Sequence, residues 1–147
     1  MKNCDRDSLD SLLHQITHLR HHKATTQFNK LGLHRGQPPI LFMLWEKDGL
    51  TQKDLAEGLN LTPPTITDTL HRIEKLGLIE RRTDLEDLRV TRVYLTEKGK
   101  SAQAEVNKAF ETLDAQCFKD FTFEEKILLR RFFIQIIDNL SEEENDH

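Results

Sequence analysis

Residues 50–99 constrain the fold of this chain more than any other segment. Two helical patterns, at about 51–59 and 62–77, are separated by the short turn Asn60-Leu61. The hydrophobic period then changes from helical to extended over Leu78–Arg82 and Val90–Leu95, which flank a charged loop. This order predicts two helices joined by a turn and followed by a β-hairpin.

The helix starts in this segment carry their own signals. The Thr51 hydroxyl can cap the free amide of Lys53 or Asp54. Thr62 is an N-cap residue, and Pro63 suits the first position of the second helix. The buried side of that helix is predicted to consist of Ile66, Leu70 and Ile73. The segment therefore predicts a winged helix-turn-helix, a shape that places its second helix in the major groove of DNA.

Further helices are predicted on both sides of this segment. They cover about 8–30 and 39–47, and another begins at Thr96. Thr122, with Glu125 three residues later, forms a capping box for the last helix. That helix is apolar nearly all round, through Ile127, Leu128, Leu129, Phe132, Phe133, Ile134, Ile136, Ile137 and Leu140. Because so short a chain has little core in which to bury it, we expect a second copy to cover it.

The predicted fold class is mostly α with a small β wing: a winged helix-turn-helix plus a long-helix dimerisation arm. At 147 residues, one domain over 1–147 is expected. Within it, 36–99 is predicted to be the DNA-binding region. Residues 1–35 and 100–147 are predicted to form a helical dimerisation region.

Composition and missing motifs exclude several classes of protein. The net charge of -4 argues against general coating of nucleic acid, although a local basic face can still bind DNA. No Gly-rich phosphate loop, nucleophile elbow or HExxH motif is present, so neither an enzyme nor a cofactor is expected. The N-terminal residues lack the apolar core of a signal peptide, so none is expected, and the longest apolar run, around Ile40 to Trp45, is too short to span a bilayer. With only two distant cysteines, it is expected in the reducing cytoplasm, away from membranes.

The exposed side of the helix that begins at Thr62 is predicted to read DNA. Its outward residues are Pro63, Pro64, Thr65, Thr67, Asp68, His71 and Arg72. The two threonines can bond base edges or phosphates, and Arg72 can bind a phosphate or a guanine. Asp68 has two readings, because its carboxylate can accept from a cytosine amino group or can orient Arg72.

The hairpin adds a second predicted contact. Its arginines are Arg81, Arg82, Arg89 and Arg92. Arg89 lies at the tip beside Asp87, where a guanidinium on a thin loop suits a narrow minor groove. Between Thr62 and Arg92, six basic residues balance six acidic ones, so the arrangement of charge must matter more than its sum.

In order and spacing, the motifs LTQKDLAEGL, LTPPTIT, IEKLGLIERR, DLEDLR and LTEKG resemble the MarR family of winged-helix regulators. The resemblance covers nearly the whole chain. It implies a homodimer on a pseudo-palindromic operator, acting as a ligand-responsive repressor or, less often, an activator. It would place Thr62, Pro63, Pro64, Thr65, Thr67, Asp68 and Arg72 at the major groove and Arg89 in the minor groove. The chain departs from the family at Asp68, where Arg is frequent, and at Leu88, where a basic residue is frequent.

The family resemblance also implies a small aromatic or anionic effector in a cleft beside the winged unit. His34, Arg35, Gln37 and Trp45 lie in the region that would line this cleft. Arg35 could pair with a carboxylate, against the simpler alternative that it ties down the connection between Gly32 and Pro39.

Two further groups of residues suggest a switch. His14, His18 and His21, with His22, share a side of the first helix and are candidates for a metal site or pH sensor, against the simpler reading of a solvated face. No metal site is predicted from them. Cys4 could be oxidised, whereas Cys117 is expected in the core.

The alternatives to a DNA-binding regulator are a winged-helix module that binds proteins instead of DNA, or a metal-sensing or redox-sensing regulator.

Overall fold

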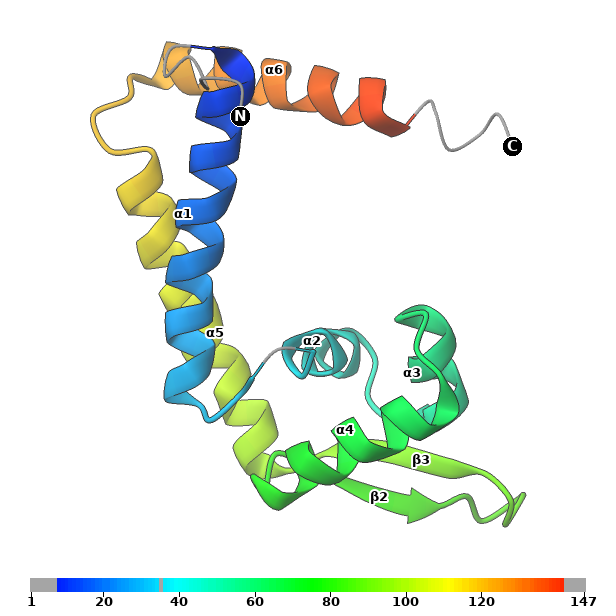
Figure 1. The fold of residues 1–147 in the computed structure, drawn as a ribbon. Coiled ribbons are helices and arrows are strands. Elements are labelled where there is room, and N and C mark those ends of the chain that lie inside the picture. The colour runs from blue at the N-terminus through cyan, green and yellow to red at the C-terminus, as the bar shows by residue number, and fades with distance from the viewer. Residues whose placement is uncertain (1–7, 35, 142–147) are drawn as a thin grey trace, which may run out of the picture. The chain divides into compact units, whose positions relative to one another are not determined.

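The computed structural model of the protein describes residues 8–34 and 36–141. These residues form six helices and three strands (Figure 1), in the order α1 (Leu9–Lys30), α2 (Pro38–Glu46), β1 (Leu50–Thr51), α3 (Gln52–Gly58), α4 (Pro63–Lys75), β2 (Ile79–Thr83), β3 (Thr91–Leu95), α5 (Glu97–Cys117) and α6 (Phe123–Ser141). The prediction of a mostly α fold with a small β wing is confirmed. The chain divides into two compact units, Met1–Glu111 and Thr112–His147, and α5 runs from the first into the second.

The wing is part of a three-stranded antiparallel sheet with the order β1-β3-β2. The hairpin pairs Ile79 with Leu95 and Thr83 with Thr91. The two-residue strand β1, which the sequence reading missed, pairs Leu50 with Val93 on the other edge of β3. The sheet thus ties the wing to the start of α3.

The core of the first unit lies among α2, α3, α4 and the sheet. It consists of Leu33, Ile40, Leu41, Leu44, Leu55, Ala56, Ile66, Leu70, Ile73, Leu78, Ile79, Val93, Leu95 and Ala102. Ile66, Leu70 and Ile73 are all buried, as their spacing predicts. Because one side of α4 is fixed in this core, its opposite side faces outward.

Local hydrogen bonds explain where α3 and α4 begin and end. The Asp54 amide donates to the Thr51 hydroxyl over 3.0 Å, and the Thr51 amide donates to the Asp54 carboxylate over 3.2 Å. The predicted cap at Thr51 is therefore confirmed, and the reciprocal bond makes it a full capping box. After α4, Gly77 adopts a φ of 78°, which suits glycine and turns the chain into β2.

The second unit contains α6 and the end of α5. The predicted capping box at α6 is confirmed by a 2.8 Å bond from the Thr122 amide to Glu125 and a 3.1 Å bond from the Glu125 amide to the Thr122 hydroxyl. The prediction that Cys117 belongs to the core is wrong, because its side chain is exposed. Helical spacing places it in line with Leu113, but it is the last residue of α5.

None of the described helices is long and apolar enough to cross a membrane.

Candidate nucleic-acid interface

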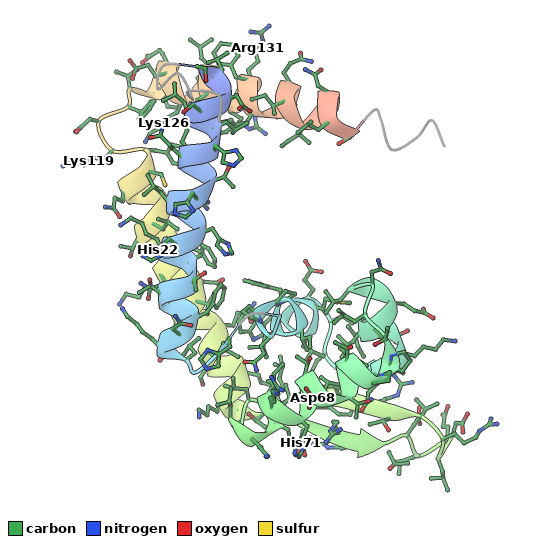
Figure 2. The ribbon with its side chains drawn as sticks, viewed as in Figure 1. His22, Asp68, His71, Lys119, Lys126 and Arg131 are labelled. Atoms are coloured by element: carbon green, nitrogen blue, oxygen red, sulfur yellow. The ribbon has the colours of Figure 1, made fainter. Side chains whose placement is uncertain are left out.

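The outward side of α4 is a continuous polar surface, which we call the exposed α4 face. It consists of Thr62, Pro63, Pro64, Thr65, Thr67, Asp68, His71 and Arg72, all exposed. Part of it borders a shallow hollow lined by Pro63, Pro64, Thr67, Asp68, His71 and Arg81. Figure 2 shows Asp68 and His71 on this helix. The structure therefore brings every residue predicted for the major groove onto one surface.

Hydrogen bonds fix the threonines at the start of this face. The hydroxyls of Thr62 and Thr65 lie 2.8 Å apart. Thr62 is the N-cap residue of α4, as predicted, and its hydroxyl bonds Thr65 and no backbone amide of the helix. The Thr67 hydroxyl donates to the Pro63 carbonyl oxygen over 2.9 Å, so its single proton is committed within the helix.

Gln52 is a residue of this surface that the sequence reading missed. Its Nε2 donates to the Thr67 hydroxyl over 3.2 Å, which connects the first residue of α3 to α4. The bond joins residues fifteen positions apart, and no local pattern signals it. It fixes the Thr67 side chain relative to the helix before the turn.

Asp68 and Arg72 form the one ion pair within the exposed α4 face among the described residues. The Arg72 Nη2 atom lies 3.1 Å from Asp68 Oδ2, one helical turn away. Both side chains are well exposed. The second of the two readings of Asp68, that it orients Arg72, thus has a direct contact in support.

At the tip of the hairpin, Asp87 holds Arg89. The Arg89 Nε and Nη2 atoms donate to the two Asp87 carboxylate oxygens over 3.0 and 3.1 Å, and the Arg89 amide donates to Oδ1. These bonds lower the pKa of Asp87 and raise that of Arg89. The Arg89 side chain nevertheless remains 90% exposed. It is therefore a preorganised cation on a narrow loop.

The other wing arginines contact neighbours within the fold. Arg92 donates to Asp84 over 2.9 Å and to the Gly49 carbonyl oxygen over 3.0 Å. Arg81 contacts Glu74 of α4 over 2.6 Å. These two arginines brace the hairpin, whereas Arg82 is exposed.

Arg82 follows Arg81 on β2 and lies directly opposite Arg92 on β3. It pairs with Glu80, and its guanidinium carbon lies 4.7 Å from the centre of the Tyr94 ring. Its side chain is exposed, so it can still meet a phosphate.

The four residues predicted to line an effector cleft have different surroundings. Gln37 is buried, and its side-chain oxygen accepts from the His34 amide over 2.9 Å, so it shapes the turn before α2. The Trp45 indole donates to the Gly99 carbonyl oxygen over 2.9 Å. His34 is exposed, and Arg35 lies outside the described residues.

Trp45 also belongs to an aromatic cluster in the first unit. The other members are Phe28, Phe42 and Phe110, which come from α1, α2 and α5. The Phe42 and Trp45 rings meet edge to face with centroids 5.4 Å apart, and Phe42 keeps part of its surface exposed. Sequence spacing alone did not indicate this cluster.

The switch residues do not form a site in the described part of the chain. His14, His18 and His21 are exposed on α1, as is His22 (Figure 2). In residues 8–34 and 36–141, no group of three or more His, Cys, Asp or Glu side chains could hold a metal ion. Cys4 lies outside the described residues.

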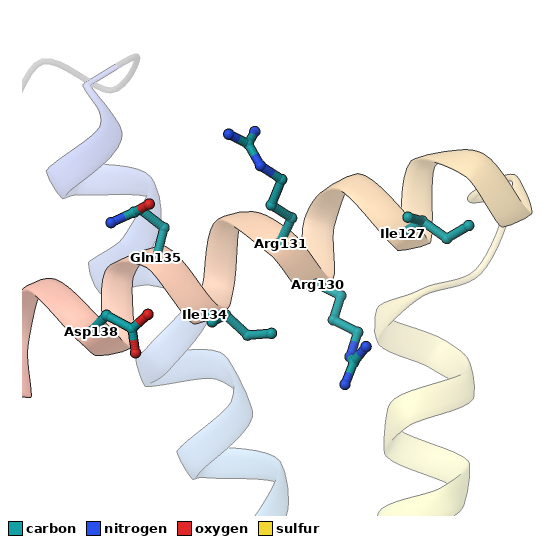
Figure 3. A pocket seen from close by; sticks show the side chains of 6 residues that line it. All are labelled: Ile127, Arg130, Arg131, Ile134, Gln135 and Asp138. Carbon is teal, nitrogen blue, oxygen red and sulfur yellow. The ribbon is translucent and has the colours of Figure 1, made fainter.

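A hollow on α6 is lined by Ile127, Arg130, Arg131, Ile134, Gln135 and Asp138 (Figure 3). All six residues belong to the same helix, so this hollow is open helix surface and not a closed pocket.

Comparison with known proteins gives a consistent result. The MarR family model matches residues 33–91. Over 125 residues, 83% of this chain and 90% of the other protein, the chain is 32% identical to the HTH-type transcriptional regulator YwoH of Bacillus subtilis. It is also 34% identical over 99 residues to the organic hydroperoxide resistance transcriptional regulator of Bacillus subtilis, with 65% and 67% of the two chains covered.

Solved structures agree with these sequence relatives. The crystal structure of MarR is 27% identical, with a TM-score of 0.72 over 97% of this chain and 98% of that one. A mutant of MepR from S. aureus, bound to an oligodeoxyribonucleotide, is 26% identical, with a TM-score of 0.74 over 90% and 98% of the chains. The predicted winged helix-turn-helix is thereby confirmed.

Proposed function

The chain belongs to the MarR family of transcriptional regulators, and from that premise we propose that it is a sequence-specific repressor that binds DNA as a homodimer. Membership makes it a DNA-binding regulator and not an enzyme. In this proposal the dimer binds a pseudo-palindromic operator in the cytoplasm, and a small aromatic or anionic effector releases or modulates it.

The observation that carries the proposal is the exposed α4 face with the Arg89 tip beside it in the same unit. One side of α4 is fixed in the core, while the other offers hydroxyls, an imidazole and a guanidinium. Such a surface suits the major groove, and an exposed guanidinium on a hairpin suits the minor groove. The proposed contacts are Thr62, Pro63, Pro64, Thr65, Thr67, Asp68, His71, Arg72, Arg82, Asp87 and Arg89.

The homodimer is supported by the apolar surface of α6. None of its residues is buried, although Ile134, Ile137 and Leu140 are large apolar side chains. Leu12, Ile16 and Leu19 of α1 are also exposed. Surfaces of this kind on a soluble chain mark protein interfaces. Covering them with a second copy would also give the two-fold symmetry that a pseudo-palindrome requires.

The effector is supported by the aromatic cluster of Phe28, Phe42, Trp45 and Phe110. Aromatic side chains favour edge-to-face and offset contacts with aromatic ligands. Because Phe42 is partly exposed, an aromatic effector could pack against it.

A binding titration at several salt concentrations tests the proposal. We expect the logarithm of the association constant for DNA from upstream of the chain's own gene to fall linearly with the logarithm of salt concentration. Adding the protein should also reduce transcription from the same DNA. A protein that bound no DNA, or bound it and increased transcription, would contradict the proposed repressor.

A further inference from the structure

Asp68 occupies the centre of the exposed α4 face. Successive residues turn by about 100° around a helix, so Asp68 lies almost opposite the buried side chains of Ile66 and Leu70. Its side chain is 63% exposed. A carboxylate placed there would be repelled by phosphates, so bringing it into a DNA groove requires a hydrogen-bond donor close to it.

Arg72 supplies one such donor and retains others. Its Nη2 atom lies 3.1 Å from Asp68 Oδ2. A guanidinium has five N–H donors in a rigid fork, and a carboxylate accepts at both oxygens. The pair therefore still presents an acceptor, on Asp68, next to two or more donors, on Arg72. An exposed ion pair of this spacing contributes little to helix stability. The hydrogen-bond donors and acceptors that the pair offers to a bound partner are therefore its more important property.

This order of groups matches one kind of base pair. In the major groove, a G·C pair presents the cytosine amino donor beside two guanine acceptors, O6 and N7. An A·T pair presents its amino donor between two acceptors. The Asp68 carboxylate would then face an acceptor, or the Arg72 guanidinium would face the amino donor, and neither arrangement allows a hydrogen bond. An acceptor beside two donors is thus complementary to G·C and mismatched to A·T.

We propose that Asp68 and Arg72 act together to read one G·C base pair in each half-site, with Asp68 accepting from cytosine N4 and Arg72 donating to guanine O6 and N7. The inference rests on the proposed function, because it requires α4 to enter the major groove. It makes Asp68 a specificity-determining residue and assigns its negative charge a role in base selection.

Selection of bound DNA from a random pool tests this assignment, with the full-length chain and three variants. The wild type should fix one G·C pair in each half-site, preferred roughly 5- to 150-fold over other pairs. The Asp68→Ala variant should lose the base preference at that position and at no other. It should also bind unselected DNA more tightly, because a charge that repels phosphates is gone. Asp68→Asn, of nearly the same size, should shift the position towards A·T, because an amide pairs with adenine N6 and N7.

Glu57→Ala is the matched control. Glu57 pairs with Lys53 one turn earlier on α3, and both side chains are exposed, so the variant removes the same charge from the same kind of ion pair. It should leave the selected sequence unchanged. If Asp68→Ala retains the same G·C preference as the wild type, the inference is wrong while the proposed function stands. If the wild type selects no sequence at all, the proposed function fails as well.

Discussion

The winged region and the last helix use the same kinds of apolar residue in opposite ways. In the winged region, Leu44, Leu70 and Ile73 are almost completely buried and belong to a single core. In α6, Ile127, Phe132 and Ile137 are comparable in size, yet about half of each side chain is exposed. Burial therefore depends on the neighbours that the fold supplies and not on the hydrophobicity of the segment.

This contrast assigns different functions to the two regions. The winged region completes its own core, so it can hold the exposed α4 face without further help. The α6 surface is complete only when something covers it, which is why we propose a second copy. Substitutions in the two regions should then affect different measurements: folding in the first, and association in the second.

Leu70→Ala should have the largest effect. Leu70 is fully buried beneath the exposed α4 face, and its truncation leaves a cavity. The free energy of unfolding should fall by about 2–5 kcal/mol in denaturant titrations. Lys75→Ala, an exposed change on the same helix, should alter it by less than about 0.5 kcal/mol. A similar small loss for Leu70→Ala would mean that the core does not fix α4.

Ile137→Asp in α6 should act mainly on association. Its side chain is 59% exposed in the single chain, but in the proposed dimer the new carboxylate would be buried in an apolar interface. Sedimentation should show the dimer dissociation constant raised by roughly 30-fold or more, the size expected for a central interface residue. As a control, Leu85→Asp changes an exposed apolar residue of the wing and should leave the oligomeric state unaltered. Equal dissociation constants for both variants would remove α6 from the interface.

Arg89→Ala should weaken DNA binding while leaving the dimer intact. It removes a preorganised, exposed cation, and the loss should be roughly tenfold at fixed salt, with the salt slope reduced by about 1. Lys119→Ala removes an equal charge from the exposed residues after α5 and provides the comparison. An unchanged affinity for Arg89→Ala would overturn the wing contact.

The smallest predicted effect is on acid stability. Hydrogen bonds from Arg89 lower the pKa of Asp87, and hydrogen bonds from the Glu86 amide and Arg92 lower that of Asp84, both below the ordinary 3.8. A lowered pKa stabilises the folded state above about pH 3.8, and this contribution is lost as the pH falls through the lowered values. Thermal unfolding should therefore show no dependence on these groups near neutral pH and a decrease below about pH 4. Asp84→Asn should make that decrease shallower; an unchanged curve would contradict the assignment.

The sequence predicts the local features of the fold well. The cap at Thr51, the buried side of α4 and the capping box before α6 all follow from residues within a few positions of one another. Strand β1 was missed because two residues carry no measurable period, and its pairing with β3 joins positions more than forty residues apart.

The candidate site was predictable to a similar degree. Helical geometry alone places the outward residues of α4 on one surface. Sequence spacing does not reveal contacts between distant residues or within an irregular turn. Such contacts include the bond from Gln52 to Thr67, the bond by which Arg92 braces the hairpin, and the bond by which Gln37 shapes its turn. Cys117 was misplaced because periodicity shows which side of a helix a residue is on but not how far the covering neighbours extend.

Footprinting on DNA selected from a random pool tests the central proposal most directly: that two copies of the winged region, held together by their helices, read DNA with α4 and the wing. We expect two symmetry-related protected half-sites, about 10 base pairs apart from centre to centre, with minor-groove protection beside each that disappears in Arg89→Ala. A single unsymmetrical protected segment, or protection unchanged in Arg89→Ala, would contradict the proposal.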